Sequence, residues 1–227
     1  MRTTTIEPMD PSISVSDDSG HKARVEDRRR SLRPILARIL SADAPFVWEI
    51  GSGHGHFLTA FAAARPETPC IGVDISLSRV TRAEIKRDRS RLPNLHFIRA
   101  DALDFLAALP PGIFLSSVFI LFPDPWPKRR HHKNRLLQPG FLAQIAERAG
   151  EGARIHFRTD HDAYFSQARD TVLASPQWRL VDEPWPFEMK TVFQARAAAY
   201  QSFTALRRTN AQAASAVRRQ EPVVKRE

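Results

Sequence analysis

The sequence predicts an α/β domain that is doubly wound around a mainly parallel sheet. From residue 45 onward, short apolar runs of strand length alternate with helical patterns roughly every 20 to 30 residues, as in a parallel sheet with crossover helices. The run that ends at Phe122 is apolar from Val118 on, on consecutive residues. Such a run is typical of a strand that is buried on both faces of a sheet.

The individual elements follow from apolar periodicity and from the residues that interrupt it. A basic amphipathic helix is expected over 22–38, and Pro139 suits the first turn of a later helix. The expected strands are 46–50, 70–75, 95–99, 117–122, 153–157, 178–182 and 189–193. The other expected helices are 56–64, 76–91, 102–109, 139–150, 162–174 and 195–218, and the segment 123–135 is expected to be a loop.

Length and composition favour one globular domain. The chain has 227 residues, of which 42% are hydrophobic and 26% charged, enough to bury a core without disulfides. We expect a disordered polar tail over 1–19, a single domain over 20–218 and a basic tail over 219–227. Within the domain, 20–44 is a basic helical lead-in, 45–194 the core and 195–218 the C-terminal helix.

Charge and cysteine content narrow the possible partners. Lys and Arg number 34 against 25 Asp and Glu, a net charge of +9, which favours a polyanion such as nucleic acid or an anionic lipid surface. The single Cys70 excludes an intramolecular disulfide and a cysteine-based metal site, and it fits a reducing cytoplasm. The most apolar stretch is too short to span a membrane. The histidines lack a compelling metal spacing, so we expect no metal.

A glycine-rich loop follows the first expected strand. Gly51, Gly53 and Gly55 alternate there, which allows a tight turn and close approach of a ligand to the backbone. The dinucleotide pattern G-x-G-x-x-G is broken because residue 56 is His. Glu49, just before the turn, would add negative charge to a pyrophosphate site but suits a cationic ligand. The loop therefore favours S-adenosylmethionine over a dinucleotide.

Two more carboxylates follow the next two strands. Asp74 lies 19 residues after Gly55, the usual place for a group that accepts ribose hydroxyls. Asp101 follows the third strand and can accept the amine of adenine, or it could be a plain helix N-cap. Because parallel strands bring their carboxyl ends to one edge, we expect Glu49, Asp74 and Asp101 to line one cofactor site.

The segment after the fourth strand has the most specific pattern. Prolines 123 and 125 fix the backbone around Asp124, Trp126 offers a stacking face, and Lys128–Arg135 contains five basic residues and no acid. A solvated basic loop is the simpler interpretation. Next to a fixed acid and an aromatic ring, a nucleotide site with a phosphate-binding rim explains the run better. The expected phosphate contacts are Arg129, Arg130, Lys133 and Arg135.

These motifs together resemble the bacterial tRNA (guanine-N7-)-methyltransferases. The likeness runs from about Val47 to Arg196 and is carried by the following motifs: Glu49–Gly55, Gly72-Val73-Asp74, Phe122–Lys128, Arg158-Thr159-Asp160 and Thr191-Val192-Phe193-Gln194. The resemblance implies a Rossmann-like class I S-adenosylmethionine-dependent methyltransferase. It further implies methyl transfer to N7 of guanine in the tRNA variable loop, at position 46 in the usual tRNA numbering.

The resemblance also implies roles for individual residues. Glu49, Asp74, Asp101 and Asp124 would contact the cofactor or its surroundings, and Asp124 would be the catalytic acid. Lys128, Asp160, Thr191 and Gln194 would contact the substrate. As a hypothesis, Asp160 accepts hydrogen bonds from N1–H and the exocyclic amine of guanine, which selects guanine over adenine.

Two departures from the family pattern bear on function. Gln194 stands where the family has Glu; Gln can still bond guanine, but without charge assistance. An RNA-binding protein with weak or lost turnover is therefore the alternative. The start of the chain lacks the family pattern, although Arg28, Arg29 and Arg30 could bind tRNA phosphate. We expect a cytoplasmic monomer or homodimer with tRNA as partner, no membrane association and no obligate protein partner.

Overall fold

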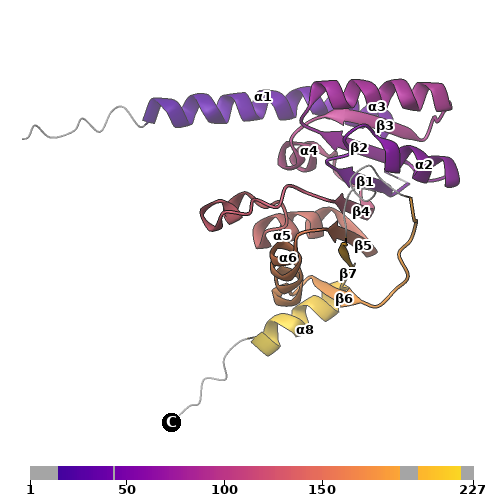
Figure 1. Ribbon diagram of the computed structural model, residues 1–227. Coiled ribbons are helices and arrows are strands. Elements are labelled where there is room, and N and C mark those ends of the chain that lie inside the picture. The colour runs from indigo at the N-terminus through magenta and orange to yellow at the C-terminus, as the bar shows by residue number, and fades with distance from the viewer. Residues whose placement is uncertain (1–14, 43, 190–198, 221–227) are drawn as a thin grey trace, which may run out of the picture.

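The computed structural model describes residues 15–42, 44–189 and 199–220. Their strands form one seven-stranded sheet with the order β3-β2-β1-β4-β5-β7-β6, which runs from top to bottom in Figure 1. The strands are β1 (Phe46–Ile50), β2 (Cys70–Asp74), β3 (Leu95–Arg99), β4 (Leu115–Leu121), β5 (Ala149–Thr159), β6 (Trp178–Val181) and β7 (Gln201–Arg207). β1 to β5 are parallel, whereas β7 runs antiparallel to β5 and β6. The predicted mainly parallel α/β fold is confirmed.

Helices cover both faces of the sheet. They are α1 (Val15–Ile39), α2 (His56–Ala64), α3 (Leu77–Ser90), α4 (Ala102–Ala108), α5 (Pro139–Arg148), α6 (Asp162–Ala174) and α8 (Asn210–Gln220), with a 3-10 helix η2 (Arg129–Asn134). β1 alternates between two core clusters: Trp48 belongs to the cluster with residues of α1, α4, α5 and α6, whereas Val47 belongs to the cluster with residues of α2 and α3. No helix in the described ranges is long and apolar enough to cross a membrane.

α1 is longer than the sequence pattern indicated. It begins at Val15, whereas the helix was expected from Lys22. Leu32, Leu36 and Leu40 fix the end of this segment in the core. The part before Leu32 extends away from the sheet (Figure 1).

The C-terminal region differs most from the prediction. Residues 201–207 were expected inside one helix over 195–218 but form β7, and the helix α8 starts at Asn210. β7 lies between β5 and β6 and pairs with both, so its backbone groups are satisfied by two ladders that the local sequence does not reveal. In the strand expected over 189–193, Met189 is not in a strand, and 190–193 lie outside the described residues. The loop expected over 123–135 contains η2.

Candidate active site

The expected site residues that the structure describes follow five parallel strands. The glycine loop follows β1, Asp74 ends β2, Asp101 follows β3, Asp124 and Lys128 follow β4, and Asp160 follows β5. Since β1 to β5 are parallel, all these segments start from the same edge of the sheet, where ligands of doubly wound folds bind. Thr191 and Gln194 lie outside the described residues.

The three loop glycines have two different tasks. All have positive φ: 72° at Gly51, 54° at Gly53 and 69° at Gly55. A Cβ on Gly55 would lie 2.4 Å from Phe97 Cζ and 2.8 Å from Ala83 Cβ, so this glycine lets α2 approach the sheet. A Cβ on Gly51 would meet nothing within 4 Å. The first part of the loop therefore leaves open space beside the backbone for a ligand.

Glu49 is a buried carboxyl group next to this loop. Its side chain is 4% exposed, and Oε2 has no hydrogen-bond partner in the part of the chain that the structure describes. Burial raises the pKa of Glu49 to about 8; the Leu58 N–H opposes this shift, and the charge of Asp74 adds to it. A buried carboxyl oxygen without a partner fits a ligand that brings a positive charge or an N–H donor. The ammonium or sulfonium of S-adenosylmethionine meets that requirement.

Asp74 connects the first two loops. Its Oδ2 accepts the backbone N–H of Gly53 at 3.0 Å, and its Oδ1 accepts that of Ser76 at 2.8 Å. Arg79 Nη1 lies 3.7 Å from Oδ2. The carboxylate thus holds the glycine loop against the end of β2. It retains lone pairs for the ribose hydroxyls that the sequence led us to expect.

Asp101 is the N-cap of α4. Its Oδ1 accepts the N–H groups of Leu103 at 2.8 Å and Asp104 at 3.4 Å. The capping role is therefore observed, as one of the two alternatives predicted. The residue is exposed and Oδ2 takes no part in these bonds, so a contact with adenine stays a prediction.

The backbone of the segment after β4 is strained. Phe122 and Trp126 have φ of 49° and 44°, and each precedes a proline. Bulky residues rarely adopt this left-handed region, and each such residue costs on the order of 1–3 kcal/mol. Asp124 lies between them and is exposed. Backbone strain of this kind concentrates where a side chain must be held for function, and here it flanks the predicted catalytic acid.

The buried side chain of Arg135 holds the segment that carries Asp124. Its Nε donates to Pro125 O at 2.8 Å, and its Nη1 donates to Ala163 O at 3.2 Å and to Gln167 Oε1 at 3.0 Å. The guanidinium carbon lies 4.9 Å from the ring centroid of Tyr164. Arg135 is only 2% exposed, so the expected phosphate contact is wrong. The side chain instead anchors Pro125 to α6.

The other basic residues of the run face solvent. Lys128, Arg129, Arg130 and Lys133 are exposed on and beside η2. We call these four residues the basic rim. Trp126 is also partly exposed and lies 5.8 Å from the ring of His131, centroid to centroid. An exposed ring beside several cations can bind a polyanion that also carries stacking bases.

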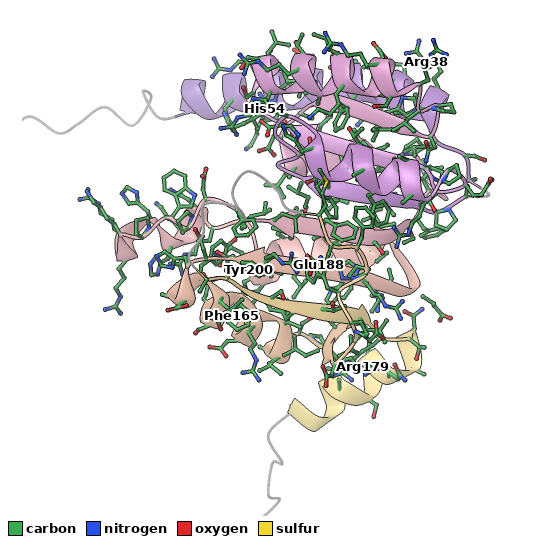
Figure 2. All side chains as sticks on the ribbon, turned by 45° about the vertical axis from the view of Figure 1, so that its right-hand side comes forward. Arg38, His54, Phe165, Arg179, Glu188 and Tyr200 are labelled. Carbon is green, nitrogen blue, oxygen red and sulfur yellow. The ribbon has the colours of Figure 1, made fainter. Side chains whose placement is uncertain are left out.

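Sequence reasoning assigned no role to Arg158, although it lies in a recognised motif. Its guanidinium is buried near the end of β5, two residues before the exposed Asp160, and it pairs with Glu188. The available signal was an arginine that directly follows Phe157 near the end of a buried strand. Figure 2 shows Glu188 and Tyr200, both of which contact Arg158, in the middle of the molecule.

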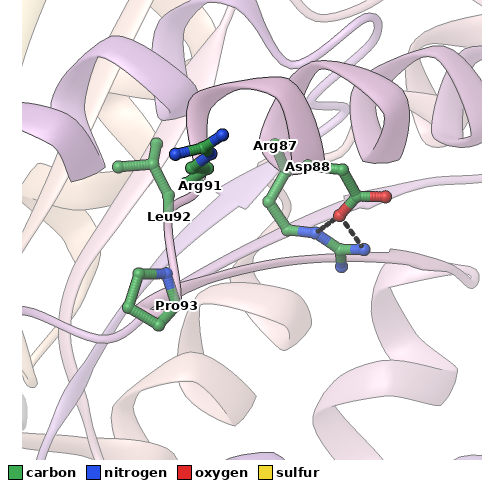
Figure 3. Close-up of a pocket in the computed structure, with 5 residues that line it drawn as sticks. All are labelled: Arg87, Asp88, Arg91, Leu92 and Pro93. Atoms are coloured by element: carbon green, nitrogen blue, oxygen red, sulfur yellow. Dashed lines mark hydrogen bonds and ion pairs between the residues drawn. The ribbon is translucent and has the colours of Figure 1, made fainter.

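A surface hollow lies away from this edge. It encloses about 400 Å³ and is lined by Arg87, Asp88, Arg91, Leu92 and Pro93 (Figure 3). These residues lie at the end of α3 and just before β3, at the amino end of that strand. An ion pair of 2.8 Å between Arg87 and Asp88 lies within it. The hollow is separate from the site at the carboxyl ends of the strands.

Comparison with known proteins identifies the fold. The solved structure of the aminoglycoside resistance methyltransferase NpmB1 superposes with a TM-score of 0.52 at 18% sequence identity, covering 77% of this chain and 93% of that one. A family model described as "Putative methyltransferase" matches residues 43–213. The fold, the glycine loop and the buried Glu49 together define a class I methyltransferase that uses S-adenosylmethionine as cofactor.

Two relatives narrow the class to a family. The tRNA (guanine-N(7)-)-methyltransferase of Halorhodospira halophila is 37% identical over 159 residues, which cover 67% of this chain and 69% of that protein. The chain belongs to this tRNA (guanine-N(7)-)-methyltransferase family, as the resemblance indicated. The enzyme of the same name from Chromohalobacter salexigens is 35% identical over 160 residues, or 70% of this chain. The match spans 63% of the length of that relative.

Proposed function

We propose that this protein methylates N7 of a guanine in tRNA, at position 46 of the variable loop. The observation that carries the proposal is the juxtaposition at one sheet edge of two unlike surfaces. One is the glycine loop with the buried Glu49, which suits a cationic methyl donor. The other is Asp124 followed by the basic rim, which suits an RNA. The names of the relatives support both the reaction and tRNA as the substrate, and this substrate implies a cytoplasmic protein.

The residues of the chain divide into those that hold the donor and those that hold the acceptor. Glu49, Asp74, Asp101 and the glycine loop would hold S-adenosylmethionine, which supplies an electrophilic methyl group. Guanine N7 has an in-plane lone pair and carries no proton at neutral pH, so the acceptor needs no strong base. The main task of the protein is to hold N7 in line with the methyl group.

Asp124 supplies the electrostatic part of the mechanism. Methylation places a positive charge on the guanine ring, and a fixed carboxylate close to it stabilises the transition state more than the neutral ground state. Arg135 and the two strained residues on either side hold the backbone that carries Asp124. Asp160 would accept N1–H and the exocyclic amine of guanine, while the basic rim contacts phosphates.

Product analysis tests the proposal directly. The protein is incubated with S-adenosylmethionine and a tRNA transcript that has guanine at the variable-loop position, and a matched transcript carries adenine there. Chemical strand scission at N7-methylguanosine is expected at that guanine alone. Methylation at another guanine would refute the position, and methylation of another atom would refute the reaction.

Gln194 favours a second candidate, an RNA-binding protein with weak or lost turnover. The two candidates differ in what Gln194→Glu does. If the native protein binds tRNA and cofactor but yields no product, and Gln194→Glu restores product, the second candidate holds. Efficient turnover by the native protein excludes it.

A further inference from the structure

Arg158 has more partners than a packing role requires. Its Nη2 donates to Glu188 Oε1 at 2.8 Å and its Nη1 donates to Glu188 Oε2 at 3.1 Å. The guanidinium carbon also lies 4.0 Å from the ring centroid of Trp185 and 4.7 Å from that of Tyr200. A planar cation between two rings and a carboxylate is geometrically fixed in a way that a lysine ammonium is not.

The backbone of Arg158 holds a further segment. Its carbonyl accepts the N–H of Phe122 at 2.8 Å, at the point where β4 ends. The ring of Phe122 lies 5.9 Å from that of Tyr200 with an interplanar angle of 78°, an edge-to-face contact. Arg158, Phe122, Trp185, Glu188 and Tyr200 thus form one connected group, which we call the Arg158 clasp.

The clasp joins the parts of the chain that carry the predicted acceptor residues. Phe122 precedes Asp124 by two residues, and Arg158 precedes Asp160 by two. Glu188 and Tyr200 flank, in sequence, the stretch in which Thr191 and Gln194 fall. A single guanidinium therefore contacts both flanks of that stretch, and the carbonyl of the same residue fixes the start of the Asp124 segment.

The position of this ion pair also differs from that of its neighbour on the same strand. Arg154 makes a similar two-pronged pair with Glu183, at 2.7 and 3.1 Å, but both side chains are more than a third exposed and lie farther from the ligand edge. The Arg158 side chain is 5% exposed. Burying a charge costs free energy that an apolar side chain of similar size would not cost. That cost is explained if the guanidinium serves the site.

We propose that Arg158 is a positioning residue for the tRNA guanine: it touches neither cofactor nor substrate, but its guanidinium holds Glu188 and Tyr200, and Tyr200 packs against Phe122 at the start of the Asp124 segment. This inference rests on the proposed function. Loss of the clasp should weaken productive binding of tRNA while the glycine loop, Glu49 and Asp74 keep their affinity for S-adenosylmethionine. The separation of the two affinities distinguishes positioning from a general effect on folding.

The test compares Arg158→Ala and Arg158→Lys with Arg154→Ala as the matched control. For Arg158→Ala we expect the KM for tRNA to rise at least about tenfold and kcat to fall, because misplacement by about 1 Å is enough to slow a reaction strongly. The dissociation constant for S-adenosylmethionine, measured by calorimetry, should stay within about twofold. Arg158→Lys keeps the charge but loses the fork and should be intermediate. Arg154→Ala should resemble the native protein in both measurements.

Two milder substitutions keep the inference testable if Arg158→Ala does not fold. Tyr200→Phe retains the ring that faces the guanidinium and should keep the native KM for tRNA. Glu188→Gln removes one charge from a half-exposed side chain. It should raise the KM for tRNA about threefold, because the ion pair becomes a weaker hydrogen bond without charge assistance.

Three results would overturn the inference: an unchanged KM for tRNA in Arg158→Ala, an equal loss of cofactor affinity, or an unchanged KM in Glu188→Gln. The native protein tests the proposed function separately. If that function is wrong, the RNA product of the native protein contains no N7-methylguanosine. Binding of tRNA, measured by filter retention, still reports on the clasp in that case. A drop in tRNA affinity confined to the Arg158 and Glu188 variants would support it.

Discussion

At the scale of single residues, Glu49 makes the stability of the folded protein depend on pH. The pKa of its carboxyl group is about 8 in the folded protein, against an ordinary value of 4.5, because burial disfavours the charged form. Between these two values the folded state binds more protons than the unfolded state. The contribution of Glu49 to stability therefore falls as the pH rises from about 4.5 to about 8.

We predict that Glu49→Gln removes this dependence. Without cofactor, the variant should be more stable than the native protein at pH 8.5, by on the order of a few kcal/mol, and the difference should shrink toward pH 5. Urea unfolding at several pH values measures it. Parallel stability profiles for the two proteins would show that the carboxyl group does not titrate in this range. The same variant should bind S-adenosylmethionine more weakly, since a neutral amide cannot pair with its positive charge.

Asp160 gives a second prediction at this scale. Asp160→Ala should lower kcat/KM for tRNA at least about tenfold, because a carboxylate that accepts two donors of guanine contributes roughly 1.5–3 kcal/mol per bond. Cofactor affinity should stay near the native value. Asp162→Ala is a suitable control, since this neighbouring exposed carboxylate is engaged by Gln201 Nε2 at 2.7 Å. Unchanged turnover in Asp160→Ala would remove this residue from the substrate site.

Single residues also show which parts of the site could be predicted from the sequence. The carboxylates Asp74 and Asp124 were predicted because acids that follow parallel strands must lie at one edge. The roles of the two buried arginines were not predicted: Arg135 was expected to contact phosphate, and Arg158 was given no role. Burial of Arg135 depends on Pro125 and Gln167, and burial of Arg158 on Glu188 and Tyr200, partners that lie 10 to 42 residues away in the chain. A run of basic letters does not distinguish an anchor from a phosphate contact.

At the scale of elements, α1 separates two kinds of arginine. Arg28 Nε lies 2.7 Å and Arg29 Nε 3.0 Å from the carboxylate of the buried Asp104 on α4, so these two residues fasten the helix to the domain. Arg24, farther toward the N-terminus, and Arg30, which among the described residues pairs only with the exposed Asp27, are exposed. The sequence predicted the helix from its apolar spacing, but not the fastening, which depends on α4.

This division predicts where α1 meets tRNA. Combined Arg24→Ala and Arg30→Ala should weaken tRNA binding and lower the slope of log affinity against log salt, by roughly 0.7–0.9 per lost phosphate contact. Thermal stability should hardly change. Asp104→Asn is the converse control, because it should destabilise the packing of α1 while the number of phosphate contacts stays the same. An unaltered salt slope in the double variant would exclude this part of α1 from the interface.

At the scale of the whole molecule, the parallel half of the sheet and the edge strand β6 were predictable from the sequence, whereas β7 was not. In the parallel half, strands are apolar runs bounded by loops with Gly, Asp or Pro, so local pattern and final structure agree. β7 reads Gln201–Arg207, a polar and alanine-containing stretch that also suits a helix. It becomes a strand because β5 and β6 offer backbone partners on both sides. The conformation of this segment is therefore determined by strand pairing in the assembled sheet and not by its own sequence.

The place of β7 has a consequence for how the protein is made. A ribosome releases β5 and β6 before β7, yet these two strands are joined only through β7. Until residue 207 has left the exit tunnel, the nascent chain carries the open edge of β5, and β6 has no neighbour in the final sheet. An open strand edge is a site of aggregation. Protection of this edge, by a chaperone or by rapid synthesis of the last segment, would therefore raise the yield of native protein.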